Sequence, residues 1–232
     1  MESYWDSTGN WRLTYFDWLK NTPDEKLTFV LRAEKEVAIT EEKVLNRLLK
    51  EGANDILELG CGVGRSIIKE ISLYPEKRFV GVDISSYQIE LFQKQISKAN
   101  ALNAKAVVCD AGDMHCLEGS FDLIVMCNHT FGNFLGETRI KALSEMCRLL
   151  TANGKILLSG FSNIDIAKQC YAEWGVKIEK IDYKTGLCKL KDYNSLWQKQ
   201  EDTNKEFFSR GFEATESIPT TLGFVNVYKR IA

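Results

Sequence analysis

The chain has 232 residues, of which 30 are basic and 32 acidic, and its formal net charge is −2. This length suits one α/β domain with a sizeable core, and the near balance of charge offers no basic footprint for nucleic acid. The sequence has neither a run of about eighteen apolar residues nor a basic stretch followed by an apolar one near its start. We therefore expect a single domain without a nucleic-acid partner, membrane span or secretory signal, and by default a cytoplasmic location.

The first 50 residues are rich in aromatic side chains and then become helical in pattern. The aromatic residues among the first eighteen positions include Tyr4, Trp5, Trp11, Tyr15, Phe16 and Trp18. Residues 41–49 then carry Val44, Leu45, Leu48 and Leu49 at helical spacing, which predicts a helix with one apolar face.

Residues 55–66 combine a buried-strand pattern with a carboxylate and a glycine-rich turn. Glu58 lies within the strand, and three alternating glycines follow it: Gly60, Gly62 and Gly64. Glycine has no Cβ, so the turn can adopt positive φ and let a ligand lie against the backbone, and a helix expected from near Arg65 would direct free N–H groups toward the ligand. The segment therefore predicts a nucleoside-cofactor site.

A second apolar strand at residues 78–83 ends in Asp83, nineteen residues after Gly64. A carboxylate at this distance can accept hydrogen bonds from the two hydroxyls of a ribose. Dinucleotide enzymes space their glycines as G-x-G-x-x-G, whereas this chain has G-x-G-x-G, and it shows no hydride-transfer site. These features disfavour a nicotinamide oxidoreductase.

The pattern resembles the first motif of class I S-adenosylmethionine-dependent methyltransferases, in their small-molecule branch. S-adenosylmethionine has no phosphate but carries an α-ammonium, so a carboxylate at the strand end suits it. The resemblance implies S-adenosylmethionine as cofactor and S-adenosylhomocysteine as product. It assigns to cofactor binding the residues Glu58, Gly60, Cys61, Gly62, Gly64, Asp83 and Ile84.

Residues 106–110 read as a third strand, and the following loop resembles the family's adenine-binding loop. The resemblance assigns the exocyclic amine of adenine to Asp110 and a ring contact to the backbone N–H of Ala111. Asp113 is the alternative carboxylate, although an aspartate there also suits a turn cap.

A fourth strand at residues 119–127 and a helix at 139–150 continue the family pattern. Asn153 and Gly154 are expected to end that helix, and residues 155–159 to begin a fifth strand. Asp122, at the entry to the fourth strand, reads as structural. The family resemblance covers residues 50–162 most strongly.

The loop at residues 128–134 follows the fourth strand, where open α/β sheets form a ligand crevice. It looks like the T-x-G-N-F loop of small-molecule N-methyltransferases and lacks the N-P-P-Y tetrad of enzymes that methylate nucleobase or glutamine amides. His129 is the candidate general base or acceptor-orienting group, although it also suits a role in fixing the loop. Asn128 is a candidate cofactor contact, and Asn133 a candidate group for holding the acceptor.

In small-molecule members of the family, the N-terminal segment folds over the cofactor as a lid. The resemblance makes Tyr4, Trp11 and Tyr15 candidate substrate contacts, and an aromatic cage of this kind would favour a cationic substrate. Core packing is the alternative for each ring.

Beyond residue 162, we expect further elements in a less regular order. The predicted ranges are a helix at 165–174, a strand pair at 176–182 and 186–190, a helix at 199–209 and a hairpin at 212–218 and 223–228. The expected fold is a Rossmann-like, doubly wound α/β domain with helices on both faces of a seven-stranded sheet, mostly parallel with an antiparallel last strand. Residues 1–232 would form this single methyltransferase domain, with an N-terminal lid segment at 1–50, a cofactor-binding core at 51–162 and a C-terminal part at 163–232.

Seven cysteines lack C-x-x-C spacing and are odd in number: Cys61, Cys109, Cys116, Cys127, Cys147, Cys170 and Cys188. We expect them to be reduced and mostly buried, with neither a disulfide framework nor a metal site. Cys127 lies near the expected reaction centre, but methyl transfer from a sulfonium requires no enzyme nucleophile.

The predicted function is methyl transfer from S-adenosylmethionine to a small-molecule acceptor, on nitrogen or oxygen. In-line displacement would depend mainly on positioning, with general-base help where the acceptor needs it. An RNA or protein methyltransferase and a non-catalytic cofactor-binding module remain alternatives. The acceptor, its reacting atom, the number of methyl groups added and the oligomeric state are not encoded in these motifs.

Overall fold

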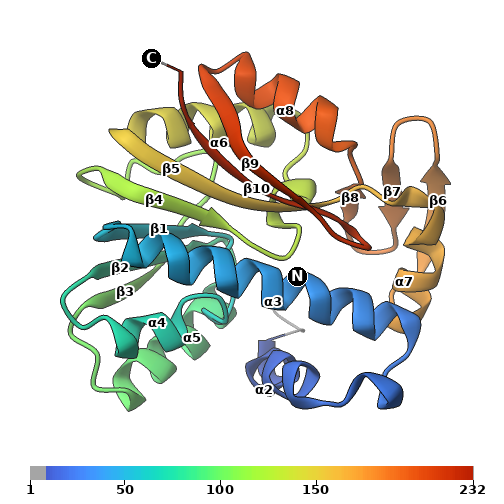
Figure 1. The fold of residues 1–232 in the computed structure, drawn as a ribbon, viewed down its shortest axis with the longest axis horizontal. Coiled ribbons are helices and arrows are strands. Elements are labelled where there is room, and N and C mark those ends of the chain that lie inside the picture. Colours follow the sequence, from blue (N-terminus) through green and yellow to red (C-terminus); the bar gives the residue numbers. More distant parts are fainter. Residues whose placement is uncertain (1–8, 232) are drawn as a thin grey trace.

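The computed structural model describes residues 9–231 and contains a seven-stranded sheet between two layers of helices (Figure 1). The strand order is β3-β2-β1-β4-β5-β10-β9. The strands are β1 (Asp55–Leu59), β2 (Arg78–Asp83), β3 (Ala104–Val108), β4 (Phe121–Met126), β5 (Leu150–Phe161), β9 (Phe212–Pro219) and β10 (Gly223–Arg230). Strands β1 to β5 pair in parallel, whereas β10 runs antiparallel to both β5 and β9. The predicted fold class and its antiparallel last strand are confirmed.

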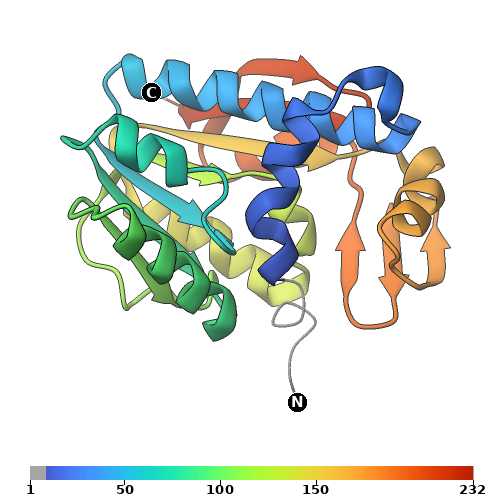
Figure 2. The ribbon, with the colours of Figure 1, turned by 90° about the horizontal axis from the view of Figure 1, so that it is seen from below.

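Helices cover both faces of the sheet, as Figures 1 and 2 show from two directions. They are α2 (Gly9–Asn21), α3 (Phe29–Lys50), α4 (Ile68–Leu73), α5 (Ser86–Lys98), α6 (Gly136–Leu149), α7 (Ala167–Glu173) and α8 (Gln200–Phe208), with short 3-10 turns η1 (Asp24–Lys26), η2 (Thr130–Asn133) and η3 (Ile164–Ile166). Alternate residues of β1 point to opposite faces, so Ile56 packs with α3, α4 and α5, while Leu57 packs with α6 and α8.

Two expected element boundaries are wrong. The helix expected from near Arg65 begins at Ile68, because the preceding residues form a turn in which the N–H groups of Ile67 and Ile68 both donate to the Gly64 carbonyl. Helix α6 ends at Leu149, and β5 begins at the next residue, so Gly154 lies inside the strand instead of ending the helix. The strand reaches this far back because Leu150 already pairs with Phe121 of β4.

A second sheet of three antiparallel strands lies at one end of the main sheet, beside α7 (Figure 1). Its strands are β6 (Ile178–Asp182), β7 (Leu187–Leu190) and β8 (Asn194–Leu196). The sequence predicts the first two but not β8, which has only three residues. This sheet and α7 share a core with α3, in which Val30, Val37 and Trp197 are buried.

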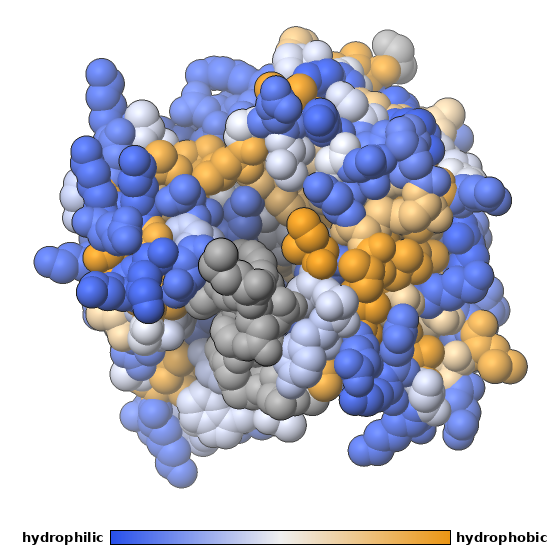
Figure 3. Space-filling model, turned by 180° about the vertical axis from the view of Figure 1, so that it is seen from behind, coloured by the Kyte–Doolittle hydropathy of each residue, from blue (hydrophilic) through white to orange (hydrophobic). Residues whose placement is uncertain are grey.

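Helix α3 links the two ends of the molecule. It has 22 residues and starts at Phe29, well before the predicted helical stretch, and the side chain of the preceding Thr28 caps it by accepting the N–H of Leu31. Its first half packs on α7 and β7, and its second half packs on the main sheet. No helix within residues 9–231 combines the length and hydrophobicity needed to cross a membrane. The molecular face opposite to that in Figure 1 is largely hydrophilic, with hydrophobic side chains near its middle (Figure 3).

Candidate functional site

A cavity of about 360 Å³ opens at the carboxyl ends of β1, β2 and β4. Its volume lies within the range of small-molecule sites. It brings together most of the predicted site residues, namely Tyr15, Glu58, Gly60, Cys61, Gly62, Asp83, Ile84, Asp110, Ala111, Asn128, His129 and Asn133. Tyr4 lies outside the described residues, and so does the side chain of Trp11, although its backbone belongs to α2.

Gly64, also predicted to bind the cofactor, is not among the residues that line the cavity. Its φ is 79°, and a Cβ atom there would lie 2.1 Å from the ring of Phe92 in α5. At Gly62 the nearest atom to a Cβ would be the side-chain oxygen of Gln88 at 2.6 Å, which is the movable end of that side chain, so its φ of 53° is the stronger requirement for glycine. Close packing on α5 therefore adds to the positive φ at Gly64 in requiring glycine there.

Asp83 joins the end of β2 to the glycine turn. Its Oδ2 accepts the backbone N–H of Gly62 at 2.8 Å, and its Oδ1 accepts that of Ser85 at 2.9 Å. Each carboxylate oxygen has two lone pairs, so a carboxylate held in this way retains acceptor capacity. The carboxylate lies at the cavity wall with a fixed orientation.

Glu58 is the most perturbed carboxyl group of the site. It is 3% exposed, and burial raises its pKa from 4.5 to about 8, against the opposing effects of the Ser66 hydroxyl and the Arg65 charge. Within residues 9–231, Glu58 Oε2 and Trp174 Nε1 are the buried side-chain polar atoms without a hydrogen-bond partner. An unpartnered buried carboxylate oxygen is costly, and a cationic ligand group would satisfy it. Glu58 therefore offers a buried acceptor to a cationic ligand group.

Of the two aspartates considered for the adenine loop, the cavity contains Asp110. Its Oδ1 accepts the N–H of Gly112 at 2.8 Å, which fixes the loop, and Ala111 lines the cavity beside it. The Asp113 side chain is 68% exposed and lies 3.7 Å from the ring of His115, away from the cavity lining. The geometry favours Asp110 as the carboxylate that faces a ligand.

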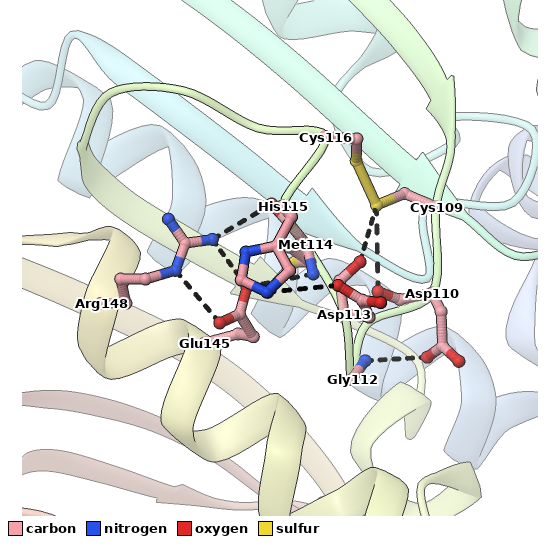
Figure 4. Close-up of a disulfide and its surroundings, with 9 residues drawn as sticks. All are labelled: Cys109, Asp110, Gly112, Asp113, Met114, His115, Cys116, Glu145 and Arg148. Carbon is pink, nitrogen blue, oxygen red and sulfur yellow. Dashed lines mark hydrogen bonds and ion pairs between the residues drawn. A yellow bond between two sulfur atoms is a disulfide. The ribbon is translucent and has the colours of Figure 1, made fainter.

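The loop that the sequence predicts to bind adenine is closed by a disulfide between Cys109 and Cys116 (Figure 4). The expectation that all cysteines are reduced is therefore wrong for this pair. The two thiols are seven residues apart, a spacing that matches no C-x-x-C motif, and the loop through Asp110 and Met114 folds back to bring them together. The other described cysteines are free and mostly buried.

The thiols nearest the cavity are not activated. Burial raises the pKa values of Cys61 and Cys127 well above the usual value of a thiol, and nearby carboxylates act in the same direction. Both side chains are therefore protonated at neutral pH. This agrees with a packing role, as the sequence predicts for Cys127.

The loop after β4 begins with two consecutive residues in the left-handed region, Asn128 at φ 52° and His129 at φ 62°. Glu41 of α3 stabilises this turn, because its Oε1 accepts the Asn128 N–H at 2.6 Å and the Ser159 hydroxyl at 2.5 Å. Glu41 is 3% exposed and also lies 3.4 Å from Arg65. Sequence reasoning missed Glu41, because its helical stretch reads as an ordinary amphipathic helix.

His129 is buried at the cavity wall and bonded at both ring nitrogens. Its Nδ1 accepts the N–H of Phe161 at 2.9 Å, so Nε2 carries the proton and donates to Ser195 Oγ at 3.1 Å. The ring also stacks on Phe161, with centroids 4.5 Å apart. Burial lowers the pKa of His129 to about 3, and the charge of Arg139 contributes. This geometry favours the loop-fixing and orienting roles over general-base catalysis.

The cavity extends beyond the predicted residues toward α7 and β8. This part is lined by side chains that sequence reasoning missed: Glu34, Phe161, Tyr171, Trp174, Tyr193 and Ser195. The Tyr15 hydroxyl donates to Glu34 Oε2 at 2.6 Å, which places one predicted aromatic residue at this end. The sequence feature that could have indicated this part of the cavity is the grouping of aromatic residues near 171–174 and 193–197, which lies outside the recognisable motifs.

Solved structures share this architecture across nearly the whole chain. The CcbJ methyltransferase from Streptomyces caelestis superposes with a TM-score of 0.70 at 13% identity, covering 100% of both chains. The magnesium protoporphyrin IX methyltransferase ChlM from Synechocystis PCC 6803, solved with bound S-adenosylmethionine, gives a TM-score of 0.63 at 17% identity and covers 97% of this chain and 91% of that one. The fold is therefore that of class I methyltransferases.

Residues 56–154 match the family model described as a methyltransferase domain. A protein of Rickettsia prowazekii, RP028, is 35% identical over 104 residues, which cover 45% of this chain and 41% of that protein. A malonyl-(acyl-carrier protein) O-methyltransferase of Priestia megaterium is 32% identical over 109 residues, which cover 47% of this chain and 37% of that protein. The chain thus spans less than half the length of these curated relatives. The match places a methyltransferase domain at residues 56–154, and the fold is the one these solved methyltransferases share, which agrees with the resemblance to class I S-adenosylmethionine-dependent methyltransferases.

Proposed function

We propose that the protein transfers a methyl group from S-adenosylmethionine to a small-molecule acceptor and releases S-adenosylhomocysteine. The observation that carries this proposal is the unpartnered buried oxygen of Glu58, in the same cavity as Asp83 and Asp110. Three carboxylates in one cavity suit a ligand with a cationic end and several hydroxyl or amine donors. A dinucleotide pyrophosphate would be repelled by the carboxylates of Asp83 and Asp110.

Each side chain then has a distinct part in binding. Glu58 would hold the α-ammonium, Asp83 the ribose hydroxyls and Asp110 the exocyclic amine of adenine, with the Ala111 N–H against the ring. The backbone of the glycine turn and residues Cys61, Ile84 and Asn128 complete the wall. Gly64 would contribute indirectly, because its packing on α5 fixes the turn.

When bound, the cofactor supplies an electrophilic methyl group, so the protein's task is positioning and exclusion of water. The buried, neutral His129 holds Phe161 and Ser195 in place, and these residues form part of the cavity wall. We assign to His129 an orienting role. Asn133 lines the same region, where its amide offers both a donor and an acceptor to the methyl-accepting molecule.

Calorimetric titration with S-adenosylmethionine tests the proposal directly, followed by incubation with methyl-labelled cofactor and a set of amines, alcohols, phenols, thiols and carboxylic acids. Asp83→Ala should weaken cofactor binding by at least about tenfold, since hydrogen bonds to a charged acceptor contribute about 1.5–3 kcal/mol each. Glu118→Gln, a surface change outside the cavity lining, serves as the control. A folded protein that takes up no S-adenosylmethionine would overturn the proposal.

A further inference from the structure

The cavity has two ends of different chemistry. One end contains the glycine turn with Glu58, Asp83 and Asp110, and the proposed function assigns it to the cofactor. The other end is formed by α2, α3, α7 and β8, and its walls are mainly aromatic. The rings there belong to Tyr15, Phe161, Tyr171, Trp174 and Tyr193. We name this end the aromatic compartment, and it also contains the carboxyl group of Glu34.

We propose that the aromatic compartment binds an organic amine as the methyl acceptor, with Glu34 recognising its nitrogen and the rings packing against its body. This inference rests on the proposed function and adds to it the class of acceptor. Glu34 is 7% exposed, and its Oε2 is held by the Tyr15 hydroxyl at 2.6 Å, so the carboxylate is fixed within the wall. Aromatic faces and a fixed carboxylate are the groups that bind ammonium ions well.

The charges around the cavity distinguish an amine from a carboxylic acid. Acidic lining residues are Glu34, Glu58, Asp83 and Asp110, whereas Arg65 is the sole Lys or Arg side chain among the described lining residues. The Arg65 guanidinium already stacks 3.8 Å from the centroid of Phe16 and pairs with Glu41. With the cofactor bound at Glu58, Asp83 and Asp110, a carboxylate acceptor would meet the like charge of Glu34 and a cation that is already engaged, whereas a cationic amine would meet an opposite charge.

The Trp174 side chain supplies an independent observation. Its indole Nε1 is a buried donor without a partner, and the residue lines the aromatic compartment. The ring packs 5.5 Å from Tyr171 and 6.0 Å from Phe161, measured between centroids. A buried N–H group usually has an acceptor, so a ligand oxygen would complete this wall. The preferred acceptor is therefore an amine that also carries a neutral oxygen.

The transfer step balances without a further reactant. The lone pair of the neutral amine forms the new N–C bond while the S–C bond breaks, and sulfur keeps that electron pair as a thioether. The product leaves as a methylated ammonium that retains its own proton. Amine in its ammonium form binds first and must lose a proton to solvent before it reacts, so turnover should increase with pH up to the pKa of the bound amine.

A matched ligand series tests the inference. Phenethylamine, phenethyl alcohol and hydrocinnamate share one aromatic body, and they are titrated into the protein saturated with S-adenosylhomocysteine. We expect the amine to bind at least about tenfold more tightly than the other two. Glu34→Gln should weaken the affinity for the amine about tenfold and change the affinity for S-adenosylhomocysteine by less than about twofold. Glu36→Gln, on the same helix but outside the cavity lining, should change neither.

Phenylalaninol, which adds a hydroxyl to the amine, tests the indole N–H. It should bind more tightly than phenethylamine, and Trp174→Phe, which keeps an aromatic ring, should remove that difference. A tighter carboxylate, equal or absent binding of the whole series, or unchanged amine affinity in Glu34→Gln would overturn the inference. If S-adenosylhomocysteine itself fails to bind, the proposed function fails first, so the two failures are distinguishable.

Discussion

Asn128 and His129 show how single residues at this site are placed by distant parts of the chain. Two consecutive residues in the left-handed region cost about 1–2 kcal/mol each, although Asn and His tolerate this conformation better than most. Glu41 on α3 accepts one of their N–H groups, and Ser159 on β5 accepts the other at 3.4 Å. The loop is therefore fixed by side chains that lie 87 and 30 residues away.

We predict that His129→Asn lowers the rate constant for methyl transfer by about tenfold, with cofactor affinity retained. The reason is loss of the bridge between Phe161 and Ser195 and not loss of a base, since a general base would contribute about 10²–10⁴-fold. Because the pKa of His129 is about 3, the wild type and this variant should have parallel pH–rate profiles from pH 5 to 8. An inflection near pH 6.5 in the wild-type profile that is absent from the variant's profile would contradict the orienting role.

Glu58 predicts a pH-dependent affinity for the cofactor. Its pKa is about 8 in the folded protein against an ordinary value of 4.5, so it is protonated at neutral pH, whereas a bound ammonium requires the carboxylate. Each proton released on binding increases affinity by up to about tenfold per pH unit. We expect the dissociation constant for S-adenosylmethionine to fall as pH rises from 5 to 7. Titrations in buffers of different ionisation enthalpy would detect the released proton, and Glu58→Gln should abolish the dependence.

The same group affects stability with the opposite trend. A carboxyl group whose pKa is raised on folding binds its proton more tightly in the folded than in the unfolded chain. Its contribution is therefore fully present below about pH 4.5 and is lost as pH rises toward about 8. Without cofactor, the free energy of unfolding of the wild type should decrease relative to that of Glu58→Gln over this interval, which denaturant titrations at several pH values would measure.

At the scale of elements, the glycine turn combines a backbone requirement with a packing requirement. Gly64 has φ 79° and no room for a Cβ, whereas Gly119 has φ 88° and open space around it. Alanine at either position incurs the cost of a left-handed conformation, but only Gly64→Ala also displaces Phe92. We expect Gly64→Ala to reduce the free energy of unfolding by about 1–3 kcal/mol more than Gly119→Ala does. If denaturant titrations gave the same loss of unfolding free energy for both variants, the packing of Gly64 against Phe92 would not contribute to stability.

The elements that sequence periodicity predicts well are those whose pattern is local. Strands β1, β2 and β4 are largely apolar runs, and their pattern, with the glycine turn, indicates the fold and predicts a cofactor site at one end of the cavity. Strand β8 has only three residues, and its partner is β7 of the small sheet, so no local pattern marks it. Glu34 and Glu41 were missed for the same reason, since only the tertiary packing of α3 brings them to the cavity and loop.

For the whole molecule, we predict that binding of the cofactor in the cavity stabilises the folded state. A ligand at 100 times its dissociation constant stabilises the folded state by about 2.7 kcal/mol, which corresponds to about 5–10 °C in Tm for a domain of this size. Thermal unfolding with and without S-adenosylmethionine would measure it. Asp83→Ala at the same ligand concentration should show a much smaller shift. An unchanged wild-type Tm, with binding established by calorimetry, would contradict the assumption that only the folded chain binds.

The small sheet β6-β7-β8 and helix α7 form one contiguous stretch of sequence that follows β5 and precedes α8. Except for Tyr15, Glu34 and Phe161, this stretch supplies the walls of the aromatic compartment, while residues earlier in the chain hold the cofactor end. Swapping residues 165–197 for the corresponding insert of another methyltransferase is thus a rational route to chimeras with altered acceptor preference. On the proposed function, such hybrids would keep Glu58, Asp83 and Asp110, so acceptor preference would change while the proposed cofactor contacts stay the same.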